Sequence, residues 1–482
     1  MIDLRPILFI LGLLLTTLAL AMSLPALVDA ATGHSDWQVF LASAGLTLFI
    51  GVALILTMRG GDMAIGIREA FILTLGSWLG VTLFSALPFA FAELDLSFAD
   101  AFFEAMSGIT TTGATVITDL DNAPPGILLW RALLQWLGGI GIIVTAVAML
   151  PMLKVGGMQL FRMESSDTSE KVLPRAAQIS TAIGSIYFGL TALCAISYWA
   201  AGMPGFDAIT HAMTTIATGG FSTSNNSLGA FSSPGVEWTA VVFMIVGSLP
   251  FVLYLQVVRG RPMSLFRDSQ VRWFLTIVLA LVIIVVLILS ISQDLSISQS
   301  IRLSAFNTVS ILTGTGYSTA AFDNWGPLAM TIFFLIMFIG GCAGSTTCGI
   351  KIFRFQILYE TSAVQIRRLV QPHGVFIPYY NRNPITDEVT MSVMSFFFFY
   401  VLVFVALALG LSALGLDFIS ALSGAATAIS NVGPGLGPVI GPSGTFASLP
   451  DAAKWLLSAG MLLGRLELFT ILVLFAPAFW KP

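Results

Sequence analysis

The sequence predicts an all-α polytopic membrane protein, built from four similar helical repeats that follow two extra N-terminal transmembrane helices. Of the 482 residues, 56% are hydrophobic and only 10% are charged, against about 25% charged in an average soluble protein. Long charge-free runs recur along the chain, and four glycine-centred segments resemble one another. This composition excludes a cytosolic enzyme and a disordered scaffold. The net charge of −4 leaves no basic surface for nucleic acid.

Ten stretches are long and apolar enough to cross a bilayer, which takes about 20 predominantly apolar residues in a helix. Nine contain no Asp, Glu, Lys or Arg, and the tenth contains only Arg465 and Glu467. The first run resembles a signal peptide, but it is longer than the usual apolar segment of about 7–15 residues, and we expect it to remain as a spanning helix. The runs are 6–28, 37–58, 70–92, 132–153, 176–206, 238–258, 273–293, 324–350, 389–416 and 455–480.

The basic residues predict the orientation of these helices. Most of the 21 Lys and Arg residues lie in loops 59–69, 154–175, 259–272 and 351–386, whereas the intervening loops carry mainly Asp and Glu. The positive-inside rule therefore places the basic loops and both termini in the cytoplasm. The acidic outer face would raise the local concentration of cations.

Four segments align without gaps, each with an apolar residue, then three mostly small or hydroxyl-bearing residues, then a glycine. A short helix-compatible stretch precedes each segment, and long apolar runs flank the pair. Close packing of helices through small residues explains a single glycine of this kind, but poorly explains four loops at matching positions on the outer side. The segments are 109–115 (ITTTGAT), 216–222 (IATGGFS), 312–318 (LTGTGYS) and 429–435 (ISNVGPG).

The repeated unit is therefore helix, half-helix, glycine loop, helix. The predicted domains are two extra N-terminal helices in 1–62 and four pore repeats in 63–155, 156–262, 263–370 and 371–482.

Such a repeat suits the passage of a cation. A hydrated cation that enters a membrane must exchange water for other oxygens, and rings of backbone carbonyls supply them. Glycine reaches positive φ without penalty, so it allows the backbone to turn its carbonyls inward. Hydroxyl and amide side chains beside it can add oxygens. The partially negative C-terminal end of each half-helix would face the cavity below the loop.

The motifs TTTGAT, ATGGFST, LTGTGYST and SNVGPG, within this repeated unit, resemble the Trk/Ktr/HKT superfamily of potassium uptake proteins. The length, the two extra helices and the C-terminal Gly-Arg-Leu-Glu run are similar to the bacterial TrkH-type membrane subunit. The resemblance covers essentially the whole chain. It implies K+ uptake across the bacterial inner membrane through a pseudo-fourfold pore, usually in a homodimer, with a cytosolic nucleotide-binding TrkA-like ring as regulator.

By position, the resemblance also implies a K+ selectivity filter. Its fourth segment departs most from the threonine-rich pattern, so we expect a preference for K+ with Rb+ accepted and weaker rejection of Na+. The filter residues are Thr110, Thr111, Thr112, Gly113, Ala217, Thr218, Gly219, Gly220, Thr313, Gly314, Thr315, Gly316, Ser430, Asn431, Val432 and Gly433.

A run of small residues interrupts the helix that follows the third loop, and such residues form a poor helix. In the resembling family, this position is an intramembrane loop that obstructs the pore, so we expect a gate here. The alternative is a kinked helix packed closely on a neighbour. A metal site at the two cysteines is disfavoured, because five residues separate them and no His lies nearby. The gate residues are Gly340, Gly341, Cys342, Ala343, Gly344, Ser345, Thr346, Thr347, Cys348 and Gly349.

Arg465 lies deep in the last apolar run, where a charge is expensive and indicates function by default. The resemblance places it beneath the filter, where it would repel cations and limit throughput. The alternative is a structural ion pair with Glu467 or Glu104. We also expect His211 to be hydrogen-bonded behind the filter and Arg302 to snorkel or pair with an outer acid.

A proton- or sodium-coupled symporter stays open as a second function, because Asp100, Glu104 and Glu467 could serve as coupling carboxylates. Their scarcity favours passive flow of K+, which we expect to be the transported ion. An intramembrane enzyme is set aside because no His-Glu-x-x-His motif or catalytic grouping appears. No organic cofactor is expected on this chain, and its other partners are membrane lipids rather than nucleic acid.

Overall fold

Helices make up nearly all of the regular structure in the computed structural model, which describes residues 2–60, 65–148, 172–293, 295–381 and 383–481. Within these ranges, seven helical segments are long and apolar enough to cross a bilayer, and nine if each of two bent helix pairs counts as one span. The chain is therefore a multi-pass membrane protein. The seven are α1 (Arg5–Thr32), α2 (Trp37–Met58), α3 with α4 (Ile67–Ser85 and Leu87–Phe91), α6 (Pro125–Ala148), α9 (Val172–Ala200), α14 (Ser269–Ser292) and α18 (Asp387–Ala413).

The prediction of ten spanning helices is wrong in two places, where a run bends sharply, and a third run is interrupted as its small residues predict. The run 238–258 bends by 95° between α11 (Pro234–Gly247) and α12 (Phe251–Val258), where Pro250 lacks the N–H that would continue the helix. The run 455–480 bends by 105° after α21 (Asp451–Arg465), where Glu467 and Leu468 adopt left-handed φ values of 61° and 52°. The run 324–350 contains only the short helix α16 (Pro327–Ile336). Hydropathy reports burial in lipid but not these backbone breaks.

Four short helices match, to within two residues, the half-helices predicted at 98–108, 206–215, 298–310 and 418–428. Two of them begin with a capping box, in which the side chains of Ser97 and Ser296 accept from the third helical N–H, and Asp417 caps a third helix in the same way. These caps end the preceding loop and fix where three of the four short helices start. The four helices are α5 (Phe98–Ile109), α10 (Gly205–Ile216), α15 (Ile297–Leu312) and α19 (Phe418–Ser430).

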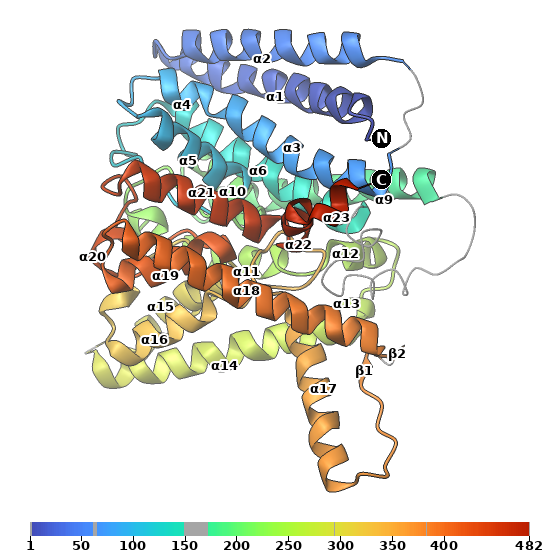
Figure 1. Ribbon diagram of the computed structural model, residues 1–482. Coiled ribbons are helices and arrows are strands. Elements are labelled where there is room, and N and C mark those ends of the chain that lie inside the picture. Colours follow the sequence, from blue (N-terminus) through green and yellow to red (C-terminus); the bar gives the residue numbers. More distant parts are fainter. Residues whose placement is uncertain (1, 61–64, 149–171, 294, 382, 482) are drawn as a thin grey trace.

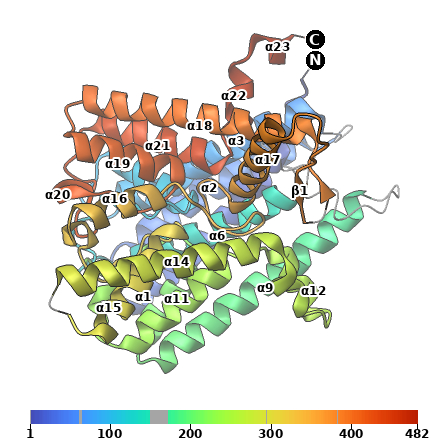
Figure 2. The same ribbon diagram turned by 90° about the horizontal axis from the view of Figure 1, so that it is seen from below.

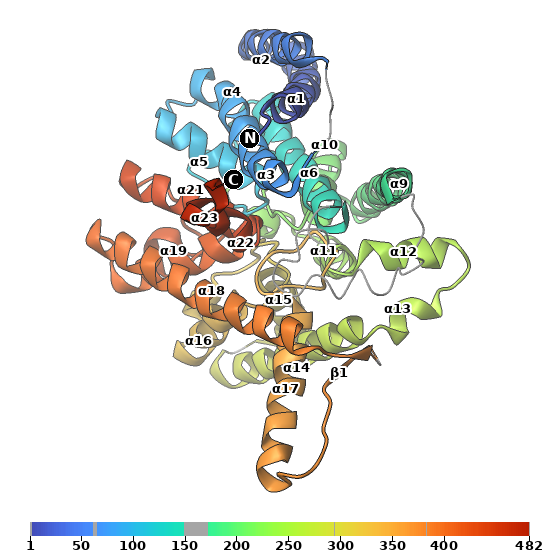
Figure 3. The same ribbon diagram turned by 45° about the vertical axis from the view of Figure 1, so that its right-hand side comes forward.

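Figure 3 shows the helices gathered in four groups around a common centre, with one of these short helices in each group. The groups follow one another in sequence order, from blue through green and yellow to red. Helices α1 and α2 lie outside the ring against the first group. In α1, the Asp29 carboxylate accepts a hydrogen bond of 2.6 Å from the backbone N–H of Gly126 at the start of α6, so it fastens the extra pair to the first repeat.

Both described ends of the chain lie at the same end of the molecule, as Figure 1 shows. From the body, α17 projects away, and the chain returns from its tip to a short antiparallel hairpin beside the start of α18, in which Tyr379 pairs with Pro384 (Figures 1 and 2). The remaining elements are α13 (Met263–Arg267), α17 (Ile352–Val370), α20 (Gly437–Ile440), α22 (Phe469–Leu472), α23 (Pro477–Trp480), η1 (Ser227–Ala230), η2 (Phe322–Asn324), η3 (Val473–Phe475), β1 (Tyr379–Tyr380) and β2 (Asn383–Pro384).

The predicted domain limits stay predictions. Those at 62/63 and 155/156, and most of the basic loop 154–175, lie outside the described residues. The charge map also placed Lys351 and Arg354 in a cytoplasmic loop. Both side chains are buried, at 7% and 0% exposure, so neither is a solvated loop residue.

Polarity is arranged inside out relative to a soluble protein. Large apolar side chains such as Phe49, Ile291 and Phe398 are exposed on the outer helices, where lipid would cover them, whereas hydroxyl-bearing residues of the four loops are buried at the centre. Buried polar groups are tolerated only when they are paired or line a water-filled path. The buried polar residues at the centre of the ring therefore mark the candidate functional site.

Candidate functional site: four glycine loops at the centre

The four glycine loops meet in cyclic order. A Cβ added to Gly220 would overlap the carbonyl oxygen of Thr315 in the third loop, and one on Gly316 would lie 2.8 Å from the backbone nitrogen of Gly433. A Cβ on Gly433 would lie 3.0 Å from the carbonyl oxygen of Gly113, and one on Gly113 would overlap a carbonyl oxygen of the second loop. Each glycine therefore lies against the next loop, and larger residues there would force the loops apart.

The loops also share an unusual backbone. The residue two before each filter glycine has positive φ, although two of these four residues are threonines, for which a left-handed conformation is a genuine outlier. Three of the four filter glycines have positive φ as well. Strain of this kind persists only where surrounding contacts enforce it, and it clusters at functional sites. The φ values are 53° at Thr111, 50° at Thr218, 72° at Gly314, 52° at Asn431, 87° at Gly113, 77° at Gly220 and 84° at Gly316.

Each loop begins at the C-terminal end of a short helix, whose last carbonyls carry partial negative charge. The capping residues Thr110, Ala217, Thr313 and Asn431 are all fully buried. The sixteen predicted filter residues include no carboxylate. A cation at this centre would therefore meet neutral carbonyl, hydroxyl and amide oxygens, which is the ligand set of a carbonyl-type selectivity filter.

One position in the short helices supports each loop from behind. Nine residues before the filter glycine, three of the repeats carry a polar side chain that holds the returning chain two or three residues beyond the glycine. In the fourth repeat this position is Gly424, which has no side chain, and the neighbouring Ser423 makes the corresponding hydrogen bond. The pairs are Glu104 with the Val116 N–H (2.9 Å), His211 Nε2 with Ser222 Oγ (3.0 Å), Asn307 with the Thr319 N–H (3.2 Å) and Ser423 with the Leu436 N–H (3.0 Å).

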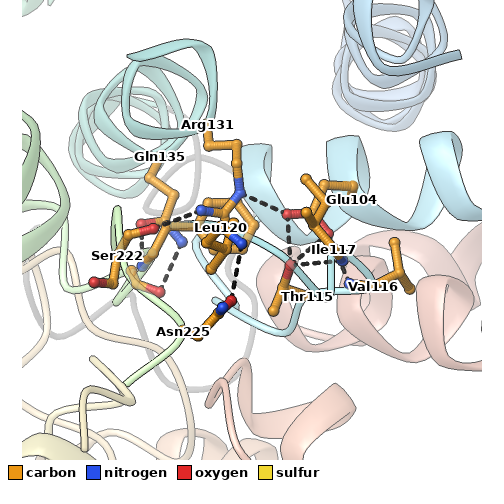
Figure 4. Close-up of polar contacts among 11 residues, drawn as sticks. Glu104, Thr115, Val116, Ile117, Leu120, Arg131, Gln135, Ser222 and Asn225 are labelled. Carbon is orange, nitrogen blue, oxygen red and sulfur yellow. Dashed lines mark hydrogen bonds and ion pairs between the residues drawn. The ribbon is translucent and has the colours of Figure 1, made fainter. Parts of the chain in front are cut away.

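A buried ion pair joins the first two loops, as Figure 4 shows. Arg131 Nε donates to Glu104 Oε1 at 2.8 Å, and Arg131 Nη1 donates to the Ser222 carbonyl oxygen at 2.6 Å. One turn later on α6, Gln135 Nε2 donates to the Gly219 carbonyl oxygen at 2.7 Å. The sequence-based reasoning missed Arg131 and Gln135. The sequence signal that could have identified them is that two polar residues lie four positions apart, and hence on one face of a helix, beside an apolar run.

The expected gate region is an ordered loop rather than a kinked helix. It is docked in the bend between α11 and α12: the Cys342 N–H donates to the Ser248 carbonyl oxygen at 3.0 Å, and the Gly344 carbonyl oxygen accepts from the Phe251 N–H at 2.9 Å. Thr346 Oγ1 lies 3.0 Å from the carbonyl oxygen of Ile216, the last residue of α10. The loop therefore lies directly beneath the end of the second short helix, and the kinked-helix alternative is wrong.

Arg465 reaches the same loop from the end of α21. Its Nη1 donates to the Thr346 carbonyl oxygen at 3.2 Å and contacts the Cys348 thiol, and its Nη2 donates to the Gly138 carbonyl oxygen at 3.0 Å. The side chain is 2% exposed. The guanidinium thus ties the fourth repeat to the gate region and to α6, and its charge stays close to the centre.

The alternative ion pair for Arg465 is wrong, because both proposed partners pair elsewhere. In the described part of the chain, each carboxylate considered for ion coupling has a basic partner. The pairs are Asp100 with Lys454 (2.5 Å), Glu104 with Arg131 (2.8 Å) and Glu467 with Arg354. His211 is hydrogen-bonded behind the second loop, and Arg302 lies 3.5 Å from Glu237, as expected for both.

The chain can be compared with known proteins. Residues 37–481 match the TrkH family, described as cation transport protein. The chain is 47% identical to the Trk system potassium uptake protein TrkI of Halomonas elongata over 99% of its own length and 97% of that protein, and 39% identical to TrkH of Salmonella typhimurium over 99% of both. The crystal structure of the potassium transporter TrkH from Vibrio parahaemolyticus superposes with a TM-score of 0.92 at 37% identity and full coverage of both chains. The chain belongs to the TrkH family of cation transport proteins.

Proposed function

We propose that this protein takes up K+ across the bacterial inner membrane through a channel-like pore with a carbonyl selectivity filter. The observation that carries the proposal is the cyclic contact of four buried, carboxylate-free glycine loops at the ends of four short helices. The names of the relatives, which are potassium uptake proteins of the Trk system, support K+ as the ion.

The filter residues are the sixteen predicted from the four loops. Their carbonyl and hydroxyl oxygens replace the hydration shell of K+, and the partially negative helix ends stabilise the ion below them. Because the four loops differ in sequence, the oxygen rings are less uniform than in a fourfold-identical pore. This difference supports a preference for K+ over Na+ with Rb+ accepted.

The loop 340–349 serves as the gate, and Arg465 as an electrostatic barrier beneath the filter. Thr346 lies against the end of α10, so the loop has to move before an ion passes on that side. Arg465 adds a buried positive charge that contacts this loop. Release of the loop would therefore require breaking hydrogen bonds to both the second and the fourth repeats.

Passive flow is the mode that the buried carboxylates support. A coupling carboxylate must bind and release its ion, but Asp100, Glu104 and Glu467 are each engaged by Lys or Arg. The membrane potential alone supplies about 2.3 kcal/mol per charge per 100 mV. A proton- or sodium-coupled symporter is therefore not favoured.

A homodimer and a cytosolic, nucleotide-binding TrkA-like ring complete the proposal, with both termini in the cytoplasm. The projecting helix α17 supports a docking role, because its apolar side chains Ile366, Leu369 and Val370 are 63%, 82% and 76% exposed. An exposed apolar patch of this kind indicates a surface that a partner covers. Arg367 and Arg368 at its end would suit an acidic partner or anionic lipid.

A glycine substitution tests the proposal. Gly316→Ser places a Cβ 2.8 Å from the Gly433 nitrogen at a residue with φ of +84°, so K+-dependent growth of a transport-deficient strain should be lost or its K+ preference reduced. Gly415→Ser is the matched control, because φ is +93° there but nothing lies within 4 Å of the added Cβ. Selective uptake that is equal in both variants, at equal membrane insertion, would contradict the filter assignment.

A further inference from the structure

The second loop lacks an internal bond that two of the other loops have. In the first loop, the Thr110 and Thr112 hydroxyls lie 2.8 Å apart, and in the third loop the Thr313 and Thr315 hydroxyls are also 2.8 Å apart. The matching residues of the second loop are Ala217 and Gly219, which have no hydroxyl. This loop therefore needs another group to hold its backbone in the filter conformation.

Gln135 supplies that group from outside the loop. Its Nε2 donates to the Gly219 carbonyl oxygen at 2.7 Å, and its Oε1 accepts from the Phe221 N–H at 3.0 Å. The side-chain amide thus spans Gly220, the filter glycine, and is fully buried. A Cβ on Gly219 would lie 2.8 Å from Gln135 Nε2 and would overlap the rest of the amide group, so the glycine leaves the space that the amide fills.

This arrangement occurs once among the four repeats. Gln135 lies four residues before Gly139 in the helix after the first loop. The residues four before the matching glycines Gly247, Gly341 and Gly464 are Phe243, Met337 and Gly460, which offer no amide or hydroxyl. Of these four positions, position 135 is therefore the one that offers an amide to a neighbouring loop.

Arg131 supports the same chain segment one turn away on α6 (Figure 4). Its guanidinium lies 4.0 Å above the Phe221 ring and donates to the Ser222 carbonyl oxygen. Glu104 anchors Arg131 in turn. Gln135 is thus held on a rigid face, and a rigid support is what a precisely placed carbonyl needs.

We propose that Gln135 is a positioning residue that sets the K+ over Na+ specificity of the pore by fixing the Gly219 carbonyl and the Phe221 N–H. A carbonyl that is held by a hydrogen bond from a buried side chain cannot shift inward to surround the smaller Na+ ion. Without the amide, the second loop would relax around either ion. The inference rests on the proposed K+-conducting function, and it adds the residue that limits relaxation of this loop.

The test measures reversal potentials of the full-length protein in liposomes under opposed K+ and Na+ gradients. Gln135→Leu keeps the approximate volume but removes both hydrogen bonds, and we expect the Na+/K+ permeability ratio to rise by about fivefold or more, the equivalent of one typical hydrogen bond. Met337→Leu is the control at the matching position of the third repeat, and such a volume-conserving change should leave the ratio unchanged.

If Gln135→Leu is not inserted into the membrane, a double-mutant cycle at positions 135 and 219 tests the inference instead. Gly219 does not need positive φ, so alanine fits its backbone. With Gln135 present, Gly219→Ala collides with the amide and should raise the Na+/K+ ratio. With Gln135→Ala present, the same change should add nothing.

The possible results distinguish failure of the proposed function from failure of the proposed role of Gln135. A wild-type protein without a K+-selective reversal potential overturns the proposed function itself. A selective wild-type protein whose ratio is the same in Gln135→Leu as in Met337→Leu, or in which the two effects at 135 and 219 simply add, overturns the role of Gln135 alone.

Discussion

Glu104→Gln is the change that tests most sharply how the first two loops are joined. The Glu104 and Arg131 side chains are 0% and 1% exposed. Besides Arg131, the carboxylate accepts from the Thr115 hydroxyl at 3.0 Å and the Val116 N–H at 2.9 Å. Glutamine preserves the shape and one acceptor oxygen but carries no charge, so the Arg131 guanidinium is left buried with only neutral acceptors such as the Ser222 carbonyl.

Breaking one side of a buried ion pair costs about 3–5 kcal/mol. Since about 1.4 kcal/mol corresponds to a factor of ten, the unfolding equilibrium should shift by roughly two to four orders of magnitude. Replacing both partners, as in Glu104→Gln with Arg131→Met, should recover much of this loss, because an uncharged pair carries no unpaired charge.

The assay is denaturant-induced unfolding in mixed micelles, followed by the fluorescence of the ten tryptophans. Asp451→Asn is the matched control: this carboxylate lies 3.7 Å from Lys454 and is 64% exposed, so its loss should change stability by about 0.5 kcal/mol or less. If Glu104→Gln is as stable as Asp451→Asn, the first two loops are not joined by this pair.

Two further predictions concern the region beneath the filter. Thr346→Val removes the hydroxyl that bonds to the Ile216 carbonyl oxygen; we expect greater K+ flux without the regulatory partner, and unchanged flux in liposomes would argue against gating by this loop. Arg465→Ala removes the buried charge and should raise single-channel K+ conductance, whereas Arg302→Ala, at a half-buried residue paired with Glu237, should not. A loss of folded protein in the first variant, with no gain of conductance, would assign Arg465 a structural role only.

Local sequence patterns carried the prediction of the short helices and the glycine loops. Each short helix is defined by residues that are close in sequence: a cap such as Ser97, a helical segment and a glycine. The loop 340–349 was predicted for the same reason, because its small residues disfavour a helix wherever it is packed. His211 also followed from its place on a short helix.

Contacts between repeats could not be predicted in this way. Gln135 and Gly219 are 84 residues apart, and Arg354 and Glu467 are 113 apart. Nothing local to Arg354 distinguishes a buried ion pair from a solvated basic residue, which is why its burial and its pairing with Glu467 were not predicted. The sharp bends were missed because a charge-free run records polarity and not the left-handed φ at Leu468.

The central claim is that the four glycine loops form a K+-selective, uncoupled pore. The most direct measurement is the reversal potential of the purified protein in liposomes under separate K+, Na+ and pH gradients. We expect a potential close to the K+ equilibrium value, a smaller shift with Na+ and none with pH. A reversal potential that follows the proton or sodium gradient together with K+, in a fixed ratio, would show coupled transport and would contradict the account.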